Sequence, residues 1–416
     1  MQKQFSSFIL CFFGIYCSYG QQTQSLTLNA CEEIFLKNNL VLLAQQYNIN
    51  AKQALIIQAK AYPNPSFNAD INVYDPQNNN FFHIDSSGQK AFQIQQLIYL
   101  GGKRKTEIDI AKKNKLLAES EFAELLRTLK VQLHTNFYSI NSEKTVLDNY
   151  EKQLQILDTI INAYKLQFDK GNLPLKDIIR LKSVYIKLSS NRSELTSSFN
   201  EEQKQLKLLL QTTVNIIPIV SENDLDPMLN LKPINELQLI AASNRPDLKM
   251  ADEQALIAAM NLKLQKKQRI PDLTLNASYD QRGGAFRNQL NAGVSMPIPL
   301  LNTNRGNIRA ADFDKKGIEL YAQEKKLEVD LDIEHAWKNM QRCIIEYVKV
   351  KSIYNEDFFS VNNGINDNFK KRNISILEFV DFVESYNESL ADYEKLKKQL
   401  AISAAQINYV TASKIY

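Results

Sequence analysis

The sequence predicts an α+β membrane protein in which four short amphipathic strands per protomer alternate with very long helices that run as coiled hairpins. Three observations lead to this fold class. One plan of helix, two strands and helical hairpin occurs twice along the chain. The helical stretches far exceed an ordinary globular helix, and four segments alternate apolar and polar residues with a period of two. The fold is therefore expected to be a tandem structural repeat.

The duplication is visible in matching segments. Residues 168–179 match residues 369–380 at their apolar positions, 201 positions later, and residues 100–104 fall opposite residues 301–305 at the same offset. A segment with three prolines separates the two copies, as expected of a connection. The predicted domains are a first repeat at 21–209, with a β-hairpin at 66–100 and a helical hairpin at 103–209, a connection at 210–233, and a second repeat at 234–416, with a β-hairpin at 272–298 and a helical hairpin at 303–416.

The N-terminus has the pattern of a cleavable secretory signal. Lys3 precedes an apolar run at 8–16, and small residues precede the polar segment that begins at Gln21. The apolar run is too short for a membrane-spanning helix. We therefore predict a signal peptide at residues 1–20.

Charge and cysteine content narrow the function classes. The 50 basic and 46 acidic residues give a net charge of +4, and the basic residues are spread among the acids, so no nucleic-acid partner is expected. Removal of the signal leaves Cys31 and Cys343, which either form a disulfide or, as we favour, are small buried residues. Acylation of Cys17 would make a lipoprotein, but the bulky Tyr16 before it disfavours this alternative.

The length of the helices is informative. The 68 residues between Gly102 and Gly171 contain neither Gly nor Pro, enough for roughly 100 Å of continuous helix. Apolar residues recur there at steps of three, four and once seven, which predicts a heptad seam that needs partner helices. The seam residues are Leu133, Phe137, Ile140, Leu147, Tyr150, Leu154, Leu157, Ile161, Tyr164 and Phe168, and in the second repeat Ile333, Trp337, Met340, Ile344, Tyr347, Tyr354, Phe358, Val361 and Ile365.

The four alternating segments are about as long as tilted strands that cross a bilayer. They centre on residues 67–73, 92–100, 273–280 and 290–296. The mature chain has no run of eighteen apolar residues, so entry into a membrane requires a barrel. A soluble β-sandwich edge is the alternative, but four strands offer too little sheet. Because the smallest outer-membrane barrels have about eight strands, protomers must combine. Two copies would close a narrow barrel filled by side chains, and three would give about twelve strands and a lumen.

Several motifs resemble those of the TolC family of outer-membrane efflux proteins, and in particular its CzcC-type heavy-metal branch. The motifs are Tyr62-Pro63-Asn64-Pro65, Leu100-Gly101-Gly102-Lys103-Arg104, Arg245-Pro246-Asp247-Leu248, Met296-Pro297-Ile298-Pro299-Leu300 and Asn304-Arg305-Gly306. The resemblance runs from about Leu26 to Ser413. It implies a TolC-like homotrimer in the lipid of the cell outer membrane, with a twelve-stranded barrel and a helical tunnel that extends into the periplasm.

The resemblance also implies function and partners. The chain would be the outer-membrane channel of a tripartite efflux system, a passive exit duct docked through a periplasmic adaptor (membrane fusion protein) to an inner-membrane resistance-nodulation-division pump. The cargo would be divalent heavy-metal cations (cobalt, zinc and cadmium, or copper and silver) or small toxic molecules. Two alternatives remain open: an exit duct for type I protein secretion, and an envelope scaffold without transport.

The family pattern assigns candidate residues to the helical turns. Glu378 and Asp381 share one helix face and match an acidic ring at the periplasmic gate, where six carboxylates in a trimer would raise one another's pKa values. A solvated helix surface is the alternative. Asp177 and Arg180 take the equivalent places in the first repeat, and Arg180 could pair with Asp381 of a neighbour.

The turns themselves would be the tips that dock the adaptor. Their candidate residues are Gly171, Asn172, Leu173, Leu175, Arg372, Asn373, Ile374 and Ile376. The alternative is that the apolar members only staple each hairpin closed. Arg372 stands where the family often has Gly, which puts the tightness of the second turn in question.

An enzymatic function is not expected. Residues 101–104 lack the spaced glycine and the Ser or Thr of a phosphate-binding loop. His83, His134 and His335 are scattered and show no zinc-site spacing, so neither a metal site nor a cofactor is predicted. Sequence alone does not explain why basic residues at 103–105 stand at a helix start, where the macrodipole disfavours cations.

Overall fold

The computed structural model describes residues 23–283, 285–353 and 356–416. The predicted signal peptide at 1–20, Cys17 and Tyr354 lie outside the described residues.

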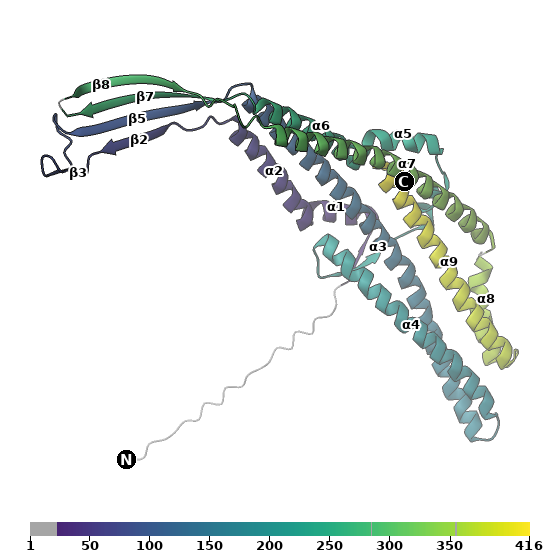
Figure 1. The fold of residues 1–416 in the computed structure, drawn as a ribbon. Helices are drawn as coiled ribbons and strands as arrows, with labels where there is room; N and C mark the ends of the chain where they lie inside the picture. Colours follow the sequence, from purple (N-terminus) through teal and green to yellow (C-terminus); the bar gives the residue numbers. More distant parts are fainter. Residues whose placement is uncertain (1–22, 284, 354–355) are drawn as a thin grey trace, which may run out of the picture. The chain divides into compact units, whose positions relative to one another are not determined.

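Both halves of the described chain follow the predicted order of elements (Figure 1). The first half contains α1 (Leu28–Asn38), α2 (Leu40–Lys60), β2 (Ser66–Ile71), β5 (Gln89–Ile98), α3 (Lys103–Asp169) and α4 (Leu175–Leu210). The second half contains α5 (Ile234–Asn244), α6 (Pro246–Lys267), β7 (Leu273–Arg282), β8 (Phe286–Ser295), α7 (Arg305–Ile353), α8 (Glu356–Lys370) and α9 (Ile376–Thr411). Helix α3, with 67 residues, confirms the long uninterrupted helix expected after Gly102.

Two segments expected to be irregular contain additional structure. Between β2 and β5 lies a small antiparallel ladder of β3 (Tyr74–Asp75) and β4 (Asn80–Phe81). The connection between the repeats contains β6 (Asn215–Pro218), which pairs in parallel with β1 (Thr23–Leu26), and two 3₁₀ turns, η1 (Glu222–Asp224) and η2 (Asp226–Leu229). Ile216 of β6 is buried, which explains why this proline-rich segment folds against the helices instead of remaining an open linker.

The described chain forms two compact units, and each unit combines residues of both repeats. Unit 1 consists of residues 23–39, 132–226 and 346–402, and unit 2 consists of residues 40–131, 227–345 and 403–416. Helices α3, α7 and α9 contribute residues to both units. The repeats therefore describe how the sequence is duplicated, and the units describe which segments pack together.

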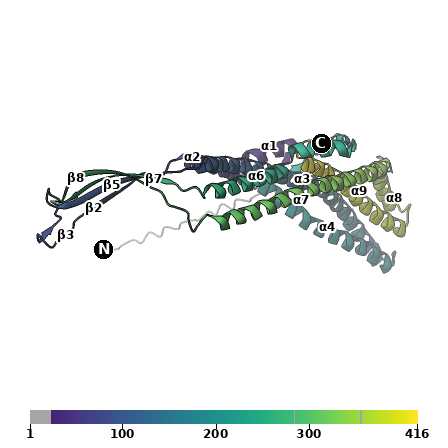
Figure 2. The same ribbon diagram turned by 45° about the horizontal axis from the view of Figure 1, so that its top comes forward.

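Unit 2 contains a four-stranded antiparallel sheet in the order β2-β5-β7-β8 (Figures 1 and 2). The two predicted hairpins meet where β5 pairs with β7, from Gln89 opposite Arg282 to Ile98 opposite Leu273. Within the described residues, β2 and β8 each pair on one side only. Both edges of the sheet are thus open in the single chain.

The sheet has one apolar and one polar face, as period-two alternation predicts. Residues directly opposite each other share a face. The apolar face carries the rows Phe67, Ile94, Ala277, Ala292 and Ala69, Phe92, Tyr279, Leu290, whereas the polar face carries the row Asn68, Gln93, Ser278, Asn291. The rings of Phe67, Phe92 and Tyr279 stack along the apolar face, with neighbouring centroids 6.2 Å apart. Leu290 on this face is 81% exposed.

Unit 1 packs α3 and α4 against α8 and α9 through an apolar cluster. The predicted seam residues Tyr150, Leu154 and Leu157 are buried at its centre. The other members are Val146, Ile160, Leu181, Val184, Leu188, Phe369, Phe379, Val380 and Val383. Two predicted seam residues are exposed instead of core: Phe168, 37% exposed where α3 nears its turn, and Val361 of α8, 46% exposed.

Two basic residues at the start of α3 contact residues of neighbouring segments. Lys103 is buried, and its Nζ lies 2.8 Å from Oδ1 of Asp272, the oxygen that also accepts the N–H of Leu100. Arg104 stacks over the ring of Tyr62 and donates to the carbonyl of Lys60, the last residue of α2. A cation is favourable at a helix C-terminus, so the α2 end compensates for the unfavourable position at the α3 start.

The Arg245-Pro246-Asp247-Leu248 motif forms a buried ion-pair cluster in unit 2. The guanidinium of Arg245, 2% exposed, donates to both carboxylate oxygens of Asp247 at 2.9 and 2.6 Å and to Asp332 of α7 at 3.1 Å. Such a fork fixes geometry as well as charge. The motif therefore holds the junction of α5 and α6 to α7.

The two cysteines of the described chain are both free and buried, Cys31 in unit 1 and Cys343 in unit 2. The expectation that they are small buried residues is confirmed. In the part of the chain that the structure describes, no helix combines the length and apolar character needed to cross a membrane.

Candidate functional site at the helical tips

The two helical hairpins end in turns of the same geometry. Gly171, after α3, has a φ of +77°, and Arg372, after α8, has a φ of +64°. The next residue in each turn, Asn172 or Asn373, donates its backbone N–H to the carbonyl five residues earlier at 2.9 Å. Its side-chain amide also bonds the side chain of that earlier residue. The second turn is therefore as tight as the first, although Arg372 replaces the glycine that usually occupies a left-handed C-terminal position.

The apolar residues of the tips differ between the two repeats. Leu175 is 54% exposed and Leu173 is half-buried. Ile374 and Ile376 are half-buried and pack against the apolar cluster of unit 1. In the single chain the second pair thus has a stapling contact, while Leu175 leaves its side chain free for a partner. Docking by any of these residues stays a prediction.

The predicted gate residues occupy different environments. Glu378 forms a capping box at the start of α9: it accepts the N–H of Ser375 at 2.7 Å, and Ser375 Oγ accepts the N–H of Glu378 at 3.2 Å. These hydrogen bonds, the backbone one first, lower the pKa of Glu378, opposite to the rise expected for a crowded ring. Asp381 and Arg180 are exposed and have no ion-pair partner within the described chain, and Asp177 is half-buried. In one protomer the four residues do not form a single cluster.

An aromatic stack joins the two tips. The ring of Phe369 in α8 lies between Tyr164 of α3, at 5.7 Å between centroids, and Phe379 of α9, at 4.0 Å. Burial raises the pKa of Tyr164, Asp177 raises it further, and Arg372 opposes that rise. Asp177 and Arg372, one from each tip, are thus both within electrostatic range of this phenol.

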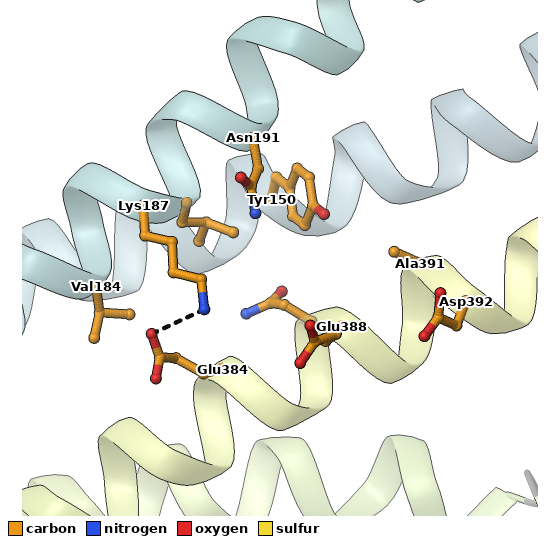
Figure 3. Close-up of a pocket in the computed structure, with 10 residues that line it drawn as sticks. Tyr150, Val184, Lys187, Asn191, Glu384, Glu388, Ala391 and Asp392 are labelled. Atoms are coloured by element: carbon orange, nitrogen blue, oxygen red, sulfur yellow. Dashed lines mark ion pairs between the residues drawn. The ribbon is translucent and has the colours of Figure 1, made fainter.

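A cavity of about 130 Å³ lies between α3, α4 and α9, away from the turns (Figure 3). Lys187 of α4 forms an ion pair with Glu384 of α9 at 3.4 Å, drawn as the dashed line. Glu388 and Asp392 follow on α9 at intervals of four residues and line the same cavity with Tyr150. This acidic row was not predicted from the sequence, although its spacing of four residues puts the side chains on one helix face and was a usable signal.

The loop between β3 and β5 is fastened around His83. Its Nδ1 lies 2.8 Å from Asp75, and its Nε2 lies 3.2 Å from Asp85 and 3.0 Å from Ser87 Oγ. The hydrogen bond to Asp75, followed by the charge of Asp85 against the opposing effect of desolvation, raises the pKa of His83. Across the described residues, no three or more His, Cys, Asp or Glu side chains are grouped so that they could hold a metal ion.

Part of the chain matches the sequence model of a known protein family. The sequence model described as "Outer membrane efflux protein" matches residues 33–210. The match covers 178 of the 416 residues, less than half of the chain. The efflux-protein segment covers most of the first repeat, so the resemblance inferred from the motifs is confirmed.

One relative and two solved structures extend the likeness along the chain. The cobalt-zinc-cadmium resistance protein CzcC of Cupriavidus metallidurans is 23% identical over 295 residues, which are 69% of this chain and 66% of CzcC, just under two thirds of its length. The structure of CusC matches with a TM-score of 0.73 at 14% identity, covering 93% of this chain and 92% of CusC. The CmeC outer membrane channel of Campylobacter jejuni matches with a TM-score of 0.74 at 13% identity, covering 93% and 86%. The chain therefore has the fold of these channels.

Proposed function

We propose that three copies of this efflux protein close their sheets into one twelve-stranded barrel in the outer membrane and act as a passive exit duct. One observation carries the proposal: the sheet of unit 2 has an exposed apolar face, a polar face and two open edges. Open edges and exposed apolar rows are unfavourable in water. In a barrel, lipid covers the apolar rows and neighbouring protomers pair with the open edges. The polar face then lines the lumen.

The cargo and partners follow from the relatives. The name of CzcC supports divalent heavy-metal cations as cargo, with other small toxic molecules as the broader class. We propose that a periplasmic adaptor docks at the tips and that an inner-membrane resistance-nodulation-division pump supplies the energy. This duct role requires no catalytic step and no cofactor from the chain itself.

The tips would form the gate of the duct. Arg180 and Asp381 are exposed and lack an ion-pair partner within the described protomer, so each is available to a neighbouring copy. We propose that Arg180 of one protomer pairs with Asp381 of the next and holds the mouth closed. Arg180→Glu should then make cells leaky to large antibiotics, and unchanged uptake would remove the pair from the mechanism.

Matched substitutions on neighbouring residues of β8 test the duct. Leu290 lies on the apolar face, and Gln289 lies on the polar face. Leu290→Arg places a cation in lipid, at a cost of about 2–4 kcal/mol per copy near the bilayer centre, and should abolish outer-membrane assembly. Gln289→Arg should assemble as a trimer and alter ion selectivity in planar bilayers. Equal assembly of both variants, or a wild-type protein that is monomeric and does not conduct, would refute the proposal.

The same reconstitution separates the alternatives. A conducting trimer excludes a scaffold without transport. Loss of zinc, cobalt, cadmium or copper resistance on deletion supports the metal cargo, whereas loss of a secreted protein with unchanged metal resistance would assign the duct to type I secretion.

A further inference from the structure

Two adjoining cavities between α3, α4 and α9 of unit 1 lie apart from the turns and from the proposed gate. The larger has a volume of about 400 Å³, within the range of small-molecule sites. The smaller, of about 130 Å³, is the one in Figure 3. Tyr150, Asn191 and Ala391 line both, so the two cavities share a wall. We call them together the Tyr150 cavity.

Glu143 adds a carboxylate to the lining of the larger part of the Tyr150 cavity. Glu143 is only 5% exposed. Oε1 accepts Ser198 Oγ at 3.0 Å and lies 3.7 Å from Lys398 Nζ, but Oε2 is buried with no hydrogen-bond partner. A buried carboxylate oxygen without a donor costs free energy, but Oε2 lies behind the cavity wall, so Glu143 contributes its negative charge to this part of the lining.

Tyr150 presents an unused polar group, in the wall common to both parts. It is 7% exposed, and its hydroxyl has no hydrogen-bond partner within the described chain. Burial raises its pKa, and the charges of Asp392 and Glu388 raise it further, so the hydroxyl stays neutral at pH 7. A neutral phenol can accept a hydrogen bond as well as donate one.

The smaller part of the Tyr150 cavity has uncompensated negative charge. Its ionisable residues are Lys187, Glu384, Glu388 and Asp392 (Figure 3). One cation against three carboxylates leaves a net charge of −2, and Lys187 is engaged by Glu384 at 3.4 Å. Neither Glu388 nor Asp392 has an ion-pair partner within the described residues. A ligand that enters here must therefore be a cation to be favoured.

We propose that the Tyr150 cavity binds a small organic ammonium ion. A primary ammonium has three N–H donors and no acceptor, which suits the carboxylates and the phenol oxygen of the smaller part, whereas Lys395 and Lys398 line only the larger part. The carbon chain would lie against Val146, Leu195 and Ala391, the apolar part of the lining. A volume of this size with apolar lining favours an organic cation over a bare ion. The site goes beyond the proposed export role, since it requires neither pump nor adaptor.

Calorimetric titration of the detergent-solubilised full chain with n-hexylammonium tests the site, with n-hexanol as the neutral analogue of the same shape. Hexylammonium should bind at least tenfold more tightly than hexanol. Glu388→Gln and Asp392→Asn should each weaken hexylammonium binding at least fivefold, and Tyr150→Phe, which removes only the hydroxyl, about threefold. Equal affinity for hexanol, or unchanged affinity in all three variants, would overturn the proposal.

Two controls make the test specific. Glu324→Gln and Asp330→Asn remove the same charges from exposed positions of α7 outside the cavity and should leave the affinity unchanged. A matching loss in these variants would mean general attraction to an acidic surface and would reject the site. Displacement of hexylammonium by equimolar zinc chloride would reject the ligand class.

A measurement on the unmodified protein covers the case in which a variant fails to fold. Hexylammonium should slow backbone hydrogen exchange at residues 143–150 and 384–392 and leave the barrel strands unchanged. Exchange that is the same with and without the amine would overturn the proposal. Because no export is measured, failure here leaves the duct proposal intact, and failure of the duct leaves this site intact.

Discussion

Replacing Arg372 by glycine tests whether the second helical turn stores backbone strain that the first turn avoids. Arg372 has a φ of +64°, in the region that Gly171 occupies at +77°. A side chain in this region costs about 1–2 kcal/mol. Glycine removes this penalty but loses more chain entropy on folding, which costs about 0.5–1 kcal/mol. The difference predicts that Arg372→Gly stabilises the closed hairpin by about 0.5–1 kcal/mol.

Native-state hydrogen exchange measures this local stability directly. The probe is the N–H of Asn373, which bonds the carbonyl of Asn368 at 2.9 Å across the turn. A gain of about 0.5–1 kcal/mol should slow its exchange about two- to fivefold. The reciprocal change Gly171→Arg should speed exchange at Asn172 by a similar factor, because nothing lies within 4 Å of an added Cβ there and only the backbone penalty remains. Wild-type rates in both variants would refute the strain argument.

Three further changes test contacts described above. Phe369→Ala removes the middle ring of the tip stack and should destabilise unit 1 by about 3–5 kcal/mol, measured by urea unfolding followed by limited proteolysis of the hairpins. Arg245→Met leaves the half-buried Asp247 without its bidentate partner and should lower the free energy of unfolding by about 3 kcal/mol, while Arg245→Lys should restore only part of that loss. The loop around His83 should be protected from exchange below about pH 6.5 and lose that protection as pH rises through the raised folded-state pKa, and His83→Ala should remove the pH dependence.

The elements of this fold could be predicted because they depend on patterns within short stretches of the chain. The helix that begins at Lys103 follows from the absence of Gly and Pro, and the apolar face of the sheet follows from alternation in each strand. Contacts between the repeats could not be predicted. Lys103 and Asp272 are 169 positions apart, and only the pairing of β5 with β7 brings them together. A charge at one helix start gives no sign of which distant carboxylate it will meet.

The candidate site was predictable to a smaller extent. The two turns were found because the duplication aligns Gly171 with Arg372, but the geometry of the second turn required the backbone itself. The capping role of Glu378 was readable from Ser375 three residues earlier, a spacing that favours reciprocal hydrogen bonds at a helix start. The acidic row on α9 escaped because surface carboxylates at helical spacing are common and only the opposing wall distinguishes this one.

The capping role changes which carboxylate can act at a closed mouth. The Glu378 carboxylate already accepts a backbone N–H within its own protomer, so the charge it would offer to a neighbour is partly compensated. Asp381 has no such commitment in the described chain, and the first repeat offers Arg180 at the position equivalent to it. If three protomers alternate these two tips around one opening, each Arg180 faces the tip of the other repeat. The ion pair that holds the proposed gate closed would then join Arg180 and Asp381. Glu378 would instead cap the start of α9, the helix that carries Asp381.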